Sequence, residues 1–412
     1  MIIYQLTDLI VFFSLLASLL LLGMRKNVTH FLSLMTLLYC YYDWIYLQLK
    51  DATHYEMVFF SGYTKEIAIY ILISALLIKS IKIKKNFLRV ALSLMIILVA
   101  SVIGISSQGF SDFIIGFNSY IPMLLLLFIL RVLRREIDIT KYLHVVIIAV
   151  IIPNVCYSIY QYLYYTRLEN FWFYDAFIHS GFALNEWDYF RGDSVRVFGF
   201  FSNTLSLTFF CFFTLLGILT YLRLGRFIFA ALTIAPMLLS GTRTVFISLF
   251  LYFALIFIYK VNIPRKLKAY LYFGTWISAF LSTIFIILTF SSEESSLGRV
   301  VQWNDAIKEL MSNPLGHGIG YAGVGLTIWP DSNVIAFIYM AGVIALFITL
   351  YIIYAYSKKL SFSDNLSFLF IILSLFVAMY QNVSPTIMLP IIALGINKRI
   401  LNYTLNSKLT SN

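Results

Sequence analysis

Three arginines each stand beside a turn that contains Gly or Ser: Arg196, Arg243 and Arg299. An arginine side chain is always charged, and its planar fork of N–H donors binds a phosphate through two hydrogen bonds at once. Three converging arginines would therefore suit a diphosphate group. The alternative for each residue taken alone is a local salt bridge or anchoring at lipid headgroups.

The composition indicates which elements carry these arginines. Of the 412 residues, 61% are hydrophobic and only 12% are charged, and the mean hydropathy is +0.87. A water-soluble core cannot absorb so much apolar surface. Segments apolar enough to cross a hydrocarbon layer of about 30 Å recur along the chain. They lie near 3–23, 31–48, 67–83, 87–106, 113–133, 142–165, 197–222, 227–240, 244–260, 269–290, 333–356, 366–380 and 384–397.

These segments predict an all-α fold, a polytopic helical membrane protein of about 12–13 transmembrane helices that form one transmembrane domain over 1–412. Segments 227–240 and 384–397 are short for a span, which leaves the number of crossings at 12 or 13. Two long loops, 166–196 and 291–332, interrupt the pattern. We expect function to lie on the side of the membrane that carries these two loops.

The placement of the charges predicts the orientation of the chain. Seven short loops hold about 22 of the 30 Lys and Arg residues, which is the pattern of cytoplasmic loops. The net charge of +11 therefore reflects topology, and we expect no nucleic-acid partner. The two long loops then lie on the outer face.

Each outer loop has its own pattern. In 291–332, the apolar positions that follow Arg299, among them Trp303 and Ile307, predict an amphipathic helix on the outer surface, ended by Asn313 and Pro314. The loop 166–196 carries aromatic residues and carboxylates. These aromatics either stack on a glycan or pack the loop onto the membrane surface.

Several familiar motifs are absent or misleading. Gly318 to Gly323 matches GxGxxG, but no strand precedes it and it follows a polar loop, so we interpret it as a false positive. No Walker lysine, HExxH, paired CxxC or GxSxG occurs. The three cysteines lie in apolar segments, which argues against a disulfide framework or a metal site. We expect no metal and no cofactor.

Five short motifs follow one another over about 195–345: Arg196-x-x-Gly199-x-x-x-Asn203, Ser240-Gly-Thr-Arg243-Thr, Arg299-x-x-x-Trp303, Asn313-Pro-Leu-Gly-x-Gly-x-Gly320, and Asp331-Ser-Asn333 before a span with Gly342. In this order they resemble the bacterial O-antigen polymerase and O-antigen ligase family of integral membrane glycosyltransferases. The first 190 residues resemble the family only in being membrane-spanning.

The resemblance implies a metal-independent, inverting transfer at the periplasmic face of the bacterial inner membrane. An undecaprenyl diphosphate-linked glycan would be the donor, and a second lipid-linked glycan the acceptor, with membrane lipids and a chain-length regulator protein as further partners. Preorganised arginines would stabilise the charge of the departing diphosphate. The resemblance implies catalytic roles for Asp331, Arg243 and Arg299 and substrate-binding roles for Arg196, Asn203, Trp303, His317 and Asn333.

A transfer to a sugar hydroxyl also needs a group that accepts the proton. Family ligases commonly carry His at the position of Asp331, a departure that fits polymerases better. Asp331 is therefore the candidate base and His317 the reserve. The alternatives are an N-cap of the following helix for Asp331 and a solvated loop residue for His317.

We therefore expect a polymerase that joins repeat units of a surface polysaccharide, either O-antigen or capsule. The nearest alternative is a ligase that attaches finished glycan to a lipid or protein acceptor. From another class, a flippase for lipid-linked oligosaccharides would share the helix number and basic inner face, but should line the centre of several spans with polar residues.

Overall fold

The computed structural model describes residues 6, 8–17, 28–52, 63–64, 66–74, 98–132, 137–179, 186–264, 267–268, 270–271, 274, 294–323, 326–328, 330, 332, 335–344 and 385–396. These residues are mostly helical, as the apolar pattern predicts. The described residues also include one hairpin of two short strands, in which Phe190 pairs with Val195 and Arg191 pairs with Ser194.

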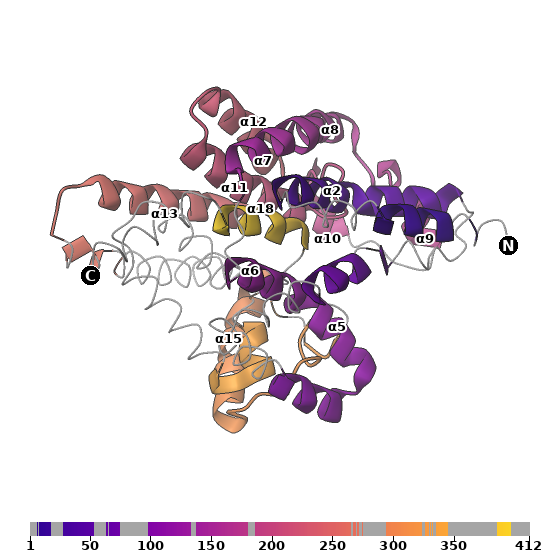
Figure 1. Ribbon diagram of the computed structural model, residues 1–412, viewed down its shortest axis with the longest axis vertical. Helices are drawn as coiled ribbons and strands as arrows, with labels where there is room; N and C mark the ends of the chain where they lie inside the picture. Colours follow the sequence, from indigo (N-terminus) through magenta and orange to yellow (C-terminus); the bar gives the residue numbers. More distant parts are fainter. Residues whose placement is uncertain are drawn as a thin grey trace. The chain divides into compact units, whose positions relative to one another are not determined.

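The elements follow one another in the order shown by colour in Figure 1. They are α2 (Val28–Ala52), α5 (Phe110–Tyr120), α6 (Pro122–Val132), α7 (Ile139–Val146), η1 (Ile147–Ile151), α8 (Ile152–Tyr164), η2 (Leu168–Asn170), α9 (Tyr174–His179), α10 (Glu186–Tyr189), β1 (Phe190–Arg191), β2 (Ser194–Val195), α11 (Thr204–Tyr221), α12 (Arg226–Leu239), α13 (Arg243–Lys260), α15 (Glu294–Ser312) and α18 (Pro385–Gly395). Further apolar helices are Asp8–Ala17, Leu98–Gln108 and Ile335–Ile344.

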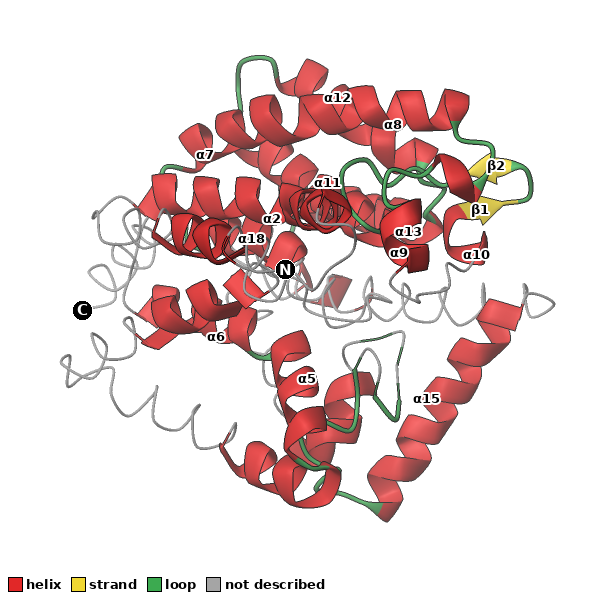
Figure 2. Ribbon diagram, turned by 90° about the vertical axis from the view of Figure 1, so that its right-hand side faces the viewer, coloured by secondary structure: helices red, strands yellow, loops and turns green. Residues whose placement is uncertain are grey.

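The chain divides into two compact units, and each is described by itself. Unit 1 comprises residues 1–79, 126–245 and 384–412, and unit 2 comprises 80–125 and 246–383. Within unit 1, α11 is buried along nearly its whole length and packs against α12 and α18. Figures 1 and 2 show α18 beside α11 and α2, so these three helices form the core of the unit.

A long helix parallel to α2 completes this core. The segments α7, η1 and α8 form one continuous helix, Ile139–Tyr164, and α2 runs alongside it. The hydroxyls of Thr36 and Tyr142 lie 2.9 Å apart, and the Tyr41 hydroxyl donates to the carbonyl of Ala149 at 2.6 Å. Because the contacts advance along both helices in the same direction, the two helices are parallel.

Two of the described helices are long and apolar enough to cross a membrane, Ile139–Tyr164 and Thr204–Tyr221. The helix α12 has 14 residues and α18 has 11, so both are as short as the sequence predicts. The predicted span 366–380 and most of 269–290 lie outside the described residues. The amphipathic helix predicted in 291–332 is present as α15, which ends at Ser312.

One predicted span begins in the wrong place. The sequence predicts a helix over 197–222, but α11 starts only at Thr204. Asn203 is extended and caps the helix, with its side chain accepting a hydrogen bond from the amide of Ser206 at 2.7 Å. Gly199 has φ +59°, a left-handed conformation that a continuing helix excludes. Residues 196–203 therefore form a loop.

In unit 2, a glycine-rich segment packs its backbone directly against two helices. The amide of Ile319 donates to the carbonyl of Ala100 at 3.0 Å, and the amide of Gly318 donates to that of Met340 at 2.9 Å. A Cβ added to Gly318 would lie 2.2 Å from the amide nitrogen of Gly104. These glycines permit close backbone contact, which gives the GxGxxG match a packing role.

Gly318→Ala should destabilise the protein far more than Gly192→Ala. Both glycines have positive φ, so each substitution costs about 1–2 kcal/mol of backbone strain. Only at Gly318 does the new methyl group also collide with backbone, which adds about 1–3 kcal/mol, because no described atom lies within 4 Å of a Cβ at Gly192. Thermal unfolding of the detergent-purified variants measures the difference. Equal losses of stability would contradict the packing role.

Candidate functional site

The loop Arg196–Asn203 is held by two buried side chains of α8. The Gln161 side-chain oxygen accepts hydrogen bonds from the amides of Phe198 and Gly199 at 3.1 and 2.9 Å. The Gln161 side-chain nitrogen donates to the Gly199 carbonyl at 3.1 Å. Two turns nearer the start of α8, the side-chain oxygen of Asn154 accepts a hydrogen bond from the amide of Phe200 at 2.9 Å. Three consecutive backbone amides of the loop thus have side-chain partners.

Residues from other elements fasten the far side of the same loop. The Ser202 hydroxyl donates to a carboxylate oxygen of Asp43, in the middle of α2, at 2.6 Å. The Tyr189 hydroxyl donates to the Ser202 carbonyl at 3.0 Å, and the indole of Trp172 donates to the Gly199 carbonyl at 3.3 Å. The loop is therefore anchored to α2, to α8 and to the segment 166–196.

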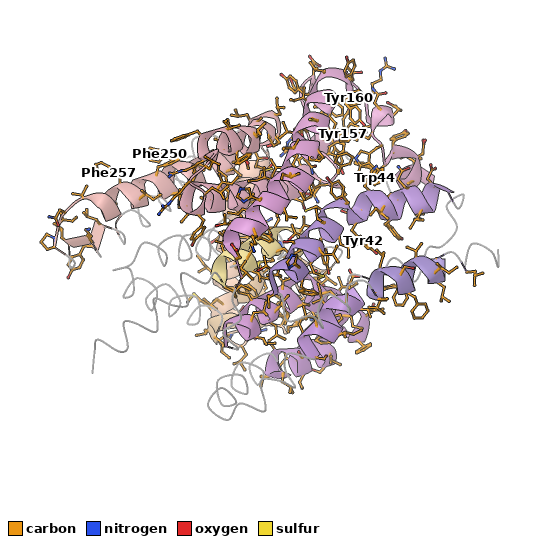
Figure 3. All side chains as sticks on the ribbon, turned by 45° about the horizontal axis from the view of Figure 1, so that its top comes forward. Tyr42, Trp44, Tyr157, Tyr160, Phe250 and Phe257 are labelled. Atoms are coloured by element: carbon orange, nitrogen blue, oxygen red, sulfur yellow. The ribbon has the colours of Figure 1, made fainter. Side chains whose placement is uncertain are left out.

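Aromatic rings cover the loop on the side of α2 and α8. The ring of Phe200 stacks on Tyr157 of α8 at a centroid distance of 4.6 Å and meets Trp44 of α2 edge-on at 6.1 Å. Figure 3 shows Tyr157 and Tyr160 along α8 and Trp44 on α2. Tyr157 in turn stacks on Tyr160, whose side chain is exposed. Phe200 itself is half-buried under these rings.

Arg196 lies beside the turn that precedes Arg243. Its side-chain Nε donates to the carbonyl of Ser240 at 3.3 Å, and its own carbonyl accepts from the Thr204 hydroxyl at 3.1 Å. The hydroxyls of Thr208 and Thr242 lie 3.4 Å apart, which ties the turn to the first part of α11. Two motifs that are far apart in sequence therefore meet in unit 1.

A helical hairpin explains why they meet. The helices α11 and α12 pack against each other and are joined by the short turn after Tyr221, where Gly225 has φ +66°. Helices joined by so short a connection run antiparallel. The start of α11 and the end of α12 therefore share one end of the hairpin, and the exposed residues Arg223 and Arg226 occupy the other.

The remaining predicted site residues are placed only in part. Arg243 is the first residue of α13, and Arg299 and Trp303 lie in α15, but the positions of their side chains lie outside the described part of the structure. Asp331 and Asn333 lie outside the described residues altogether. Arg299 belongs to unit 2, whereas Arg196 belongs to unit 1. The convergence of all three arginines stays a prediction.

His317 is described fully, and its ring has partners on both nitrogens. Nε2 lies 2.7 Å from a carboxylate oxygen of Glu309, and Nδ1 lies 3.4 Å from the side-chain nitrogen of Asn313. The ring also stacks on Tyr321 at 4.0 Å. Burial and, second, the charge of Glu309 raise the pKa of Tyr321. These contacts link the end of α15 to the glycine-rich segment. To act as a base, His317 would have to give up its contact with Glu309.

The aromatic residues of loop 166–196 pack mainly against one another. Phe171, Phe173, Tyr189 and Phe198 are all buried, and the ring of Phe198 lies 4.9 Å from that of Phe171 and 5.1 Å from that of Phe173. Among the described aromatics of this loop, these rings therefore serve as its core. Stacking on a glycan and packing onto the membrane surface both stay predictions for the remaining aromatic residues of the loop.

Sequence reasoning missed the residues that hold the loop. Asn154 and Gln161 stand seven positions apart in an apolar span, so they lie on one face of the helix. Polar side chains on one face of a span are a signal that could have identified them. Their partners, the amides of residues 198–200, carry no sequence signal of their own.

Comparison with known proteins does not assign the chain to a family. No family model, no curated protein and no solved structure matches the chain. Among the described residues, no group of three or more His, Cys, Asp or Glu side chains is placed to hold a metal ion.

Asn203 offers a test that separates a helix cap from a substrate ligand. Asn203→Ser keeps an N-cap oxygen and should leave the free energy of unfolding within a few tenths of a kcal/mol, whereas Asn203→Ala should lower it by about 1 kcal/mol. Thermal unfolding measures the cap. If the amide also binds substrate, Asn203→Ser will lose activity while remaining stable. An alanine variant as stable as the serine variant would contradict the capping role.

Proposed function

We propose that the chain is a membrane polymerase that joins undecaprenyl diphosphate-linked repeat units of a surface polysaccharide at the periplasmic face of the bacterial inner membrane. One observation carries the proposal: Arg196 donates to the carbonyl of Ser240, the first residue of the turn that leads to Arg243. Two arginines on adjacent backbone segments suit recognition of a diphosphate, because each can bind a phosphate through two hydrogen bonds.

A multi-pass topology is part of the proposal, and the direction of the helices supports it. If α2 and α7–α8 both cross the membrane, their parallel direction requires an odd number of crossings in the chain between them. The three segments predicted near 67–83, 87–106 and 113–133 meet this requirement. The exposed Arg223 marks the cytoplasmic end of the α11–α12 hairpin. The loop that carries Arg196 then faces outward.

The proposed reaction transfers the growing glycan from its lipid carrier to the next unit. A hydroxyl oxygen of the acceptor sugar attacks the anomeric carbon of the donor, and the bond from that carbon to the diphosphate oxygen breaks. Undecaprenyl diphosphate leaves with the electron pair, and the arginines stabilise its developing charge. Asp331 takes the hydroxyl proton or, if the transfer is largely dissociative, only positions the sugar.

Arg196→Lys and Arg243→Lys should each reduce polymer by at least about 10-fold, because lysine keeps the charge but loses the two-point fork, and one charged hydrogen bond is worth about 1.5–3 kcal/mol. The measurement is surface polysaccharide on a gel, normalised to protein in the membrane. Arg223→Lys, at the other end of the hairpin, is the matched control and should give normal polymer. Normal polymer length in the Arg243 variant would reduce that residue to a topology anchor.

Deletion of the gene separates the candidate functions on the same gel. The polymerase predicts single repeat units attached to the normal acceptor. Absence of any attached glycan would mean a ligase instead, and lipid-linked units trapped on the cytoplasmic side would mean a flippase.

Asp331→Asn tests the proton acceptor. Asparagine keeps the N-cap capacity and nearly the same shape, but it removes the charge. We expect at least about a 100-fold loss of polymer at normal membrane abundance, in line with the usual contribution of a general base. Wild-type polymer would assign Asp331 to helix capping alone.

A further inference from the structure

A polar stripe follows one face of α8. Asn154, Ser158 and Gln161 are spaced so that all three lie on the same side of the helix, and each is at most 1% exposed. Gln161 and Asn154 bind the loop amides of residues 198–200. The Ser158 hydroxyl lies between them and has no hydrogen-bond partner in the described structure. The stripe thus contains two side chains that hold the loop and one that does not.

The stripe begins far from the C-terminal end of α8. α8 continues to Tyr164, so Asn154 lies about 15 Å along the axis from that end. The amide of Phe200, which binds Asn154, must lie at the same level. With the topology proposed above, residues 198–200 are non-helical backbone inside the membrane. Such backbone persists only where the protein itself satisfies its polar groups.

The loop and the stripe are matched closely in shape. A Cβ added to Gly199 would lie 2.2 Å from the side-chain oxygen of Asn154, so only glycine brings this backbone against the helix. The Asn154 side-chain nitrogen in turn donates to the carbonyl of Val150 at 2.9 Å, which fixes the orientation of the amide. The bond to Val150 therefore orients the Asn154 side-chain oxygen toward the amide of Phe200.

The course of the loop sets the position of Arg196. Its carbonyl is bound by Thr204, after the loop, and its amide donates to the carbonyl of Tyr189, before the loop, at 2.7 Å. Phe198 follows Arg196 by only two residues, so departure of residues 198–200 from α8 would pull on Arg196 and weaken its contact with the carbonyl of Ser240. An unpaired amide in apolar surroundings is costly, so removal of Gln161 or Asn154 favours that departure.

We propose that Asn154 and Gln161 are positioning residues, which hold the loop Arg196–Asn203 within the membrane and thereby aim Arg196 at the diphosphate of the lipid-linked substrate. This inference rests on the proposed function for its ligand. The fixed course of the loop does not depend on that function, and it can be measured separately.

The first measurement is binding of undecaprenyl diphosphate to the purified full-length protein in detergent. Gln161→Met and Asn154→Leu keep the approximate size of the side chains and remove the hydrogen bonds, so affinity should fall at least about 10-fold. Ser158→Ala changes a buried position on the same stripe without removing a described bond, and should bind like the wild type. Full affinity in both positioning variants would overturn the inference.

The second measurement needs no substrate. Phe200→Cys, in a chain whose Cys40, Cys156 and Cys211 are replaced by Ala, is exposed to a membrane-impermeant maleimide. Labelling should be slow, at least about 10-fold faster when Gln161→Met is added, and unchanged when Ser158→Ala is added. Equal rates in all three would overturn the inference. If Asn154→Leu does not reach the membrane, Gln161→Met alone decides both measurements.

Arg196→Gln distinguishes failure of this inference from failure of the proposed function. If Arg196→Gln binds undecaprenyl diphosphate like the wild type, the diphosphate site is wrong, and the claim that Asn154 and Gln161 aim Arg196 fails with it. If that variant loses binding while Gln161→Met and Asn154→Leu keep it, only the positioning role is wrong.

Discussion

The pairing of three backbone amides, those of residues 198–200, is the constraint on which the arrangement of unit 1 depends. Apolar helices surround this loop and offer few partners for an N–H group, so an unpaired amide there would be costly. Gln161 and Asn154 supply the acceptors from one face of α8. Because these acceptors are fixed to a helix, the loop has one course, and Arg196 has one position.

The helical hairpin of α11 and α12 extends this constraint to a second motif. Both helices start or end beside the loop, so the turn at Ser240 is brought against Arg196. The Thr208 and Thr242 hydroxyls then join α11 to the turn that follows α12. Buried hydroxyl contacts of this kind hold apolar helices together where the hydrophobic effect cannot distinguish one register from another.

The sequence predicts the helices better than it predicts where α11 begins, the boundary that places Arg196 and Gly199 in a loop. The periodic apolar pattern after Arg299 correctly predicts a helix that ends before Asn313. The same reasoning places Val197 to Asn203 in a span, because these residues are largely apolar and the side chains that bind the loop come from a distant helix. A loop stabilised by distant partners leaves no local periodicity. Asn203, followed by an apolar run, was the one local sign of the true helix start.

The candidate site shows the same limit. The motif order led to Arg196 and to the Ser240 turn, which the fold brings together, but the spacing of motifs could not reveal Asn154 or Gln161. The position of Arg299 relative to Arg196 depends on how the two units assemble, and neither composition nor spacing predicts such an arrangement.

Reconstitution tests the central claim most directly. The purified protein would be placed in liposomes with undecaprenyl diphosphate-linked repeat units of its own organism, without nucleotide and with a chelator of divalent metals. The account predicts a ladder of polymers together with one released undecaprenyl diphosphate for each bond formed. Repeat units that stay single, with intact protein in the same membranes, would contradict it.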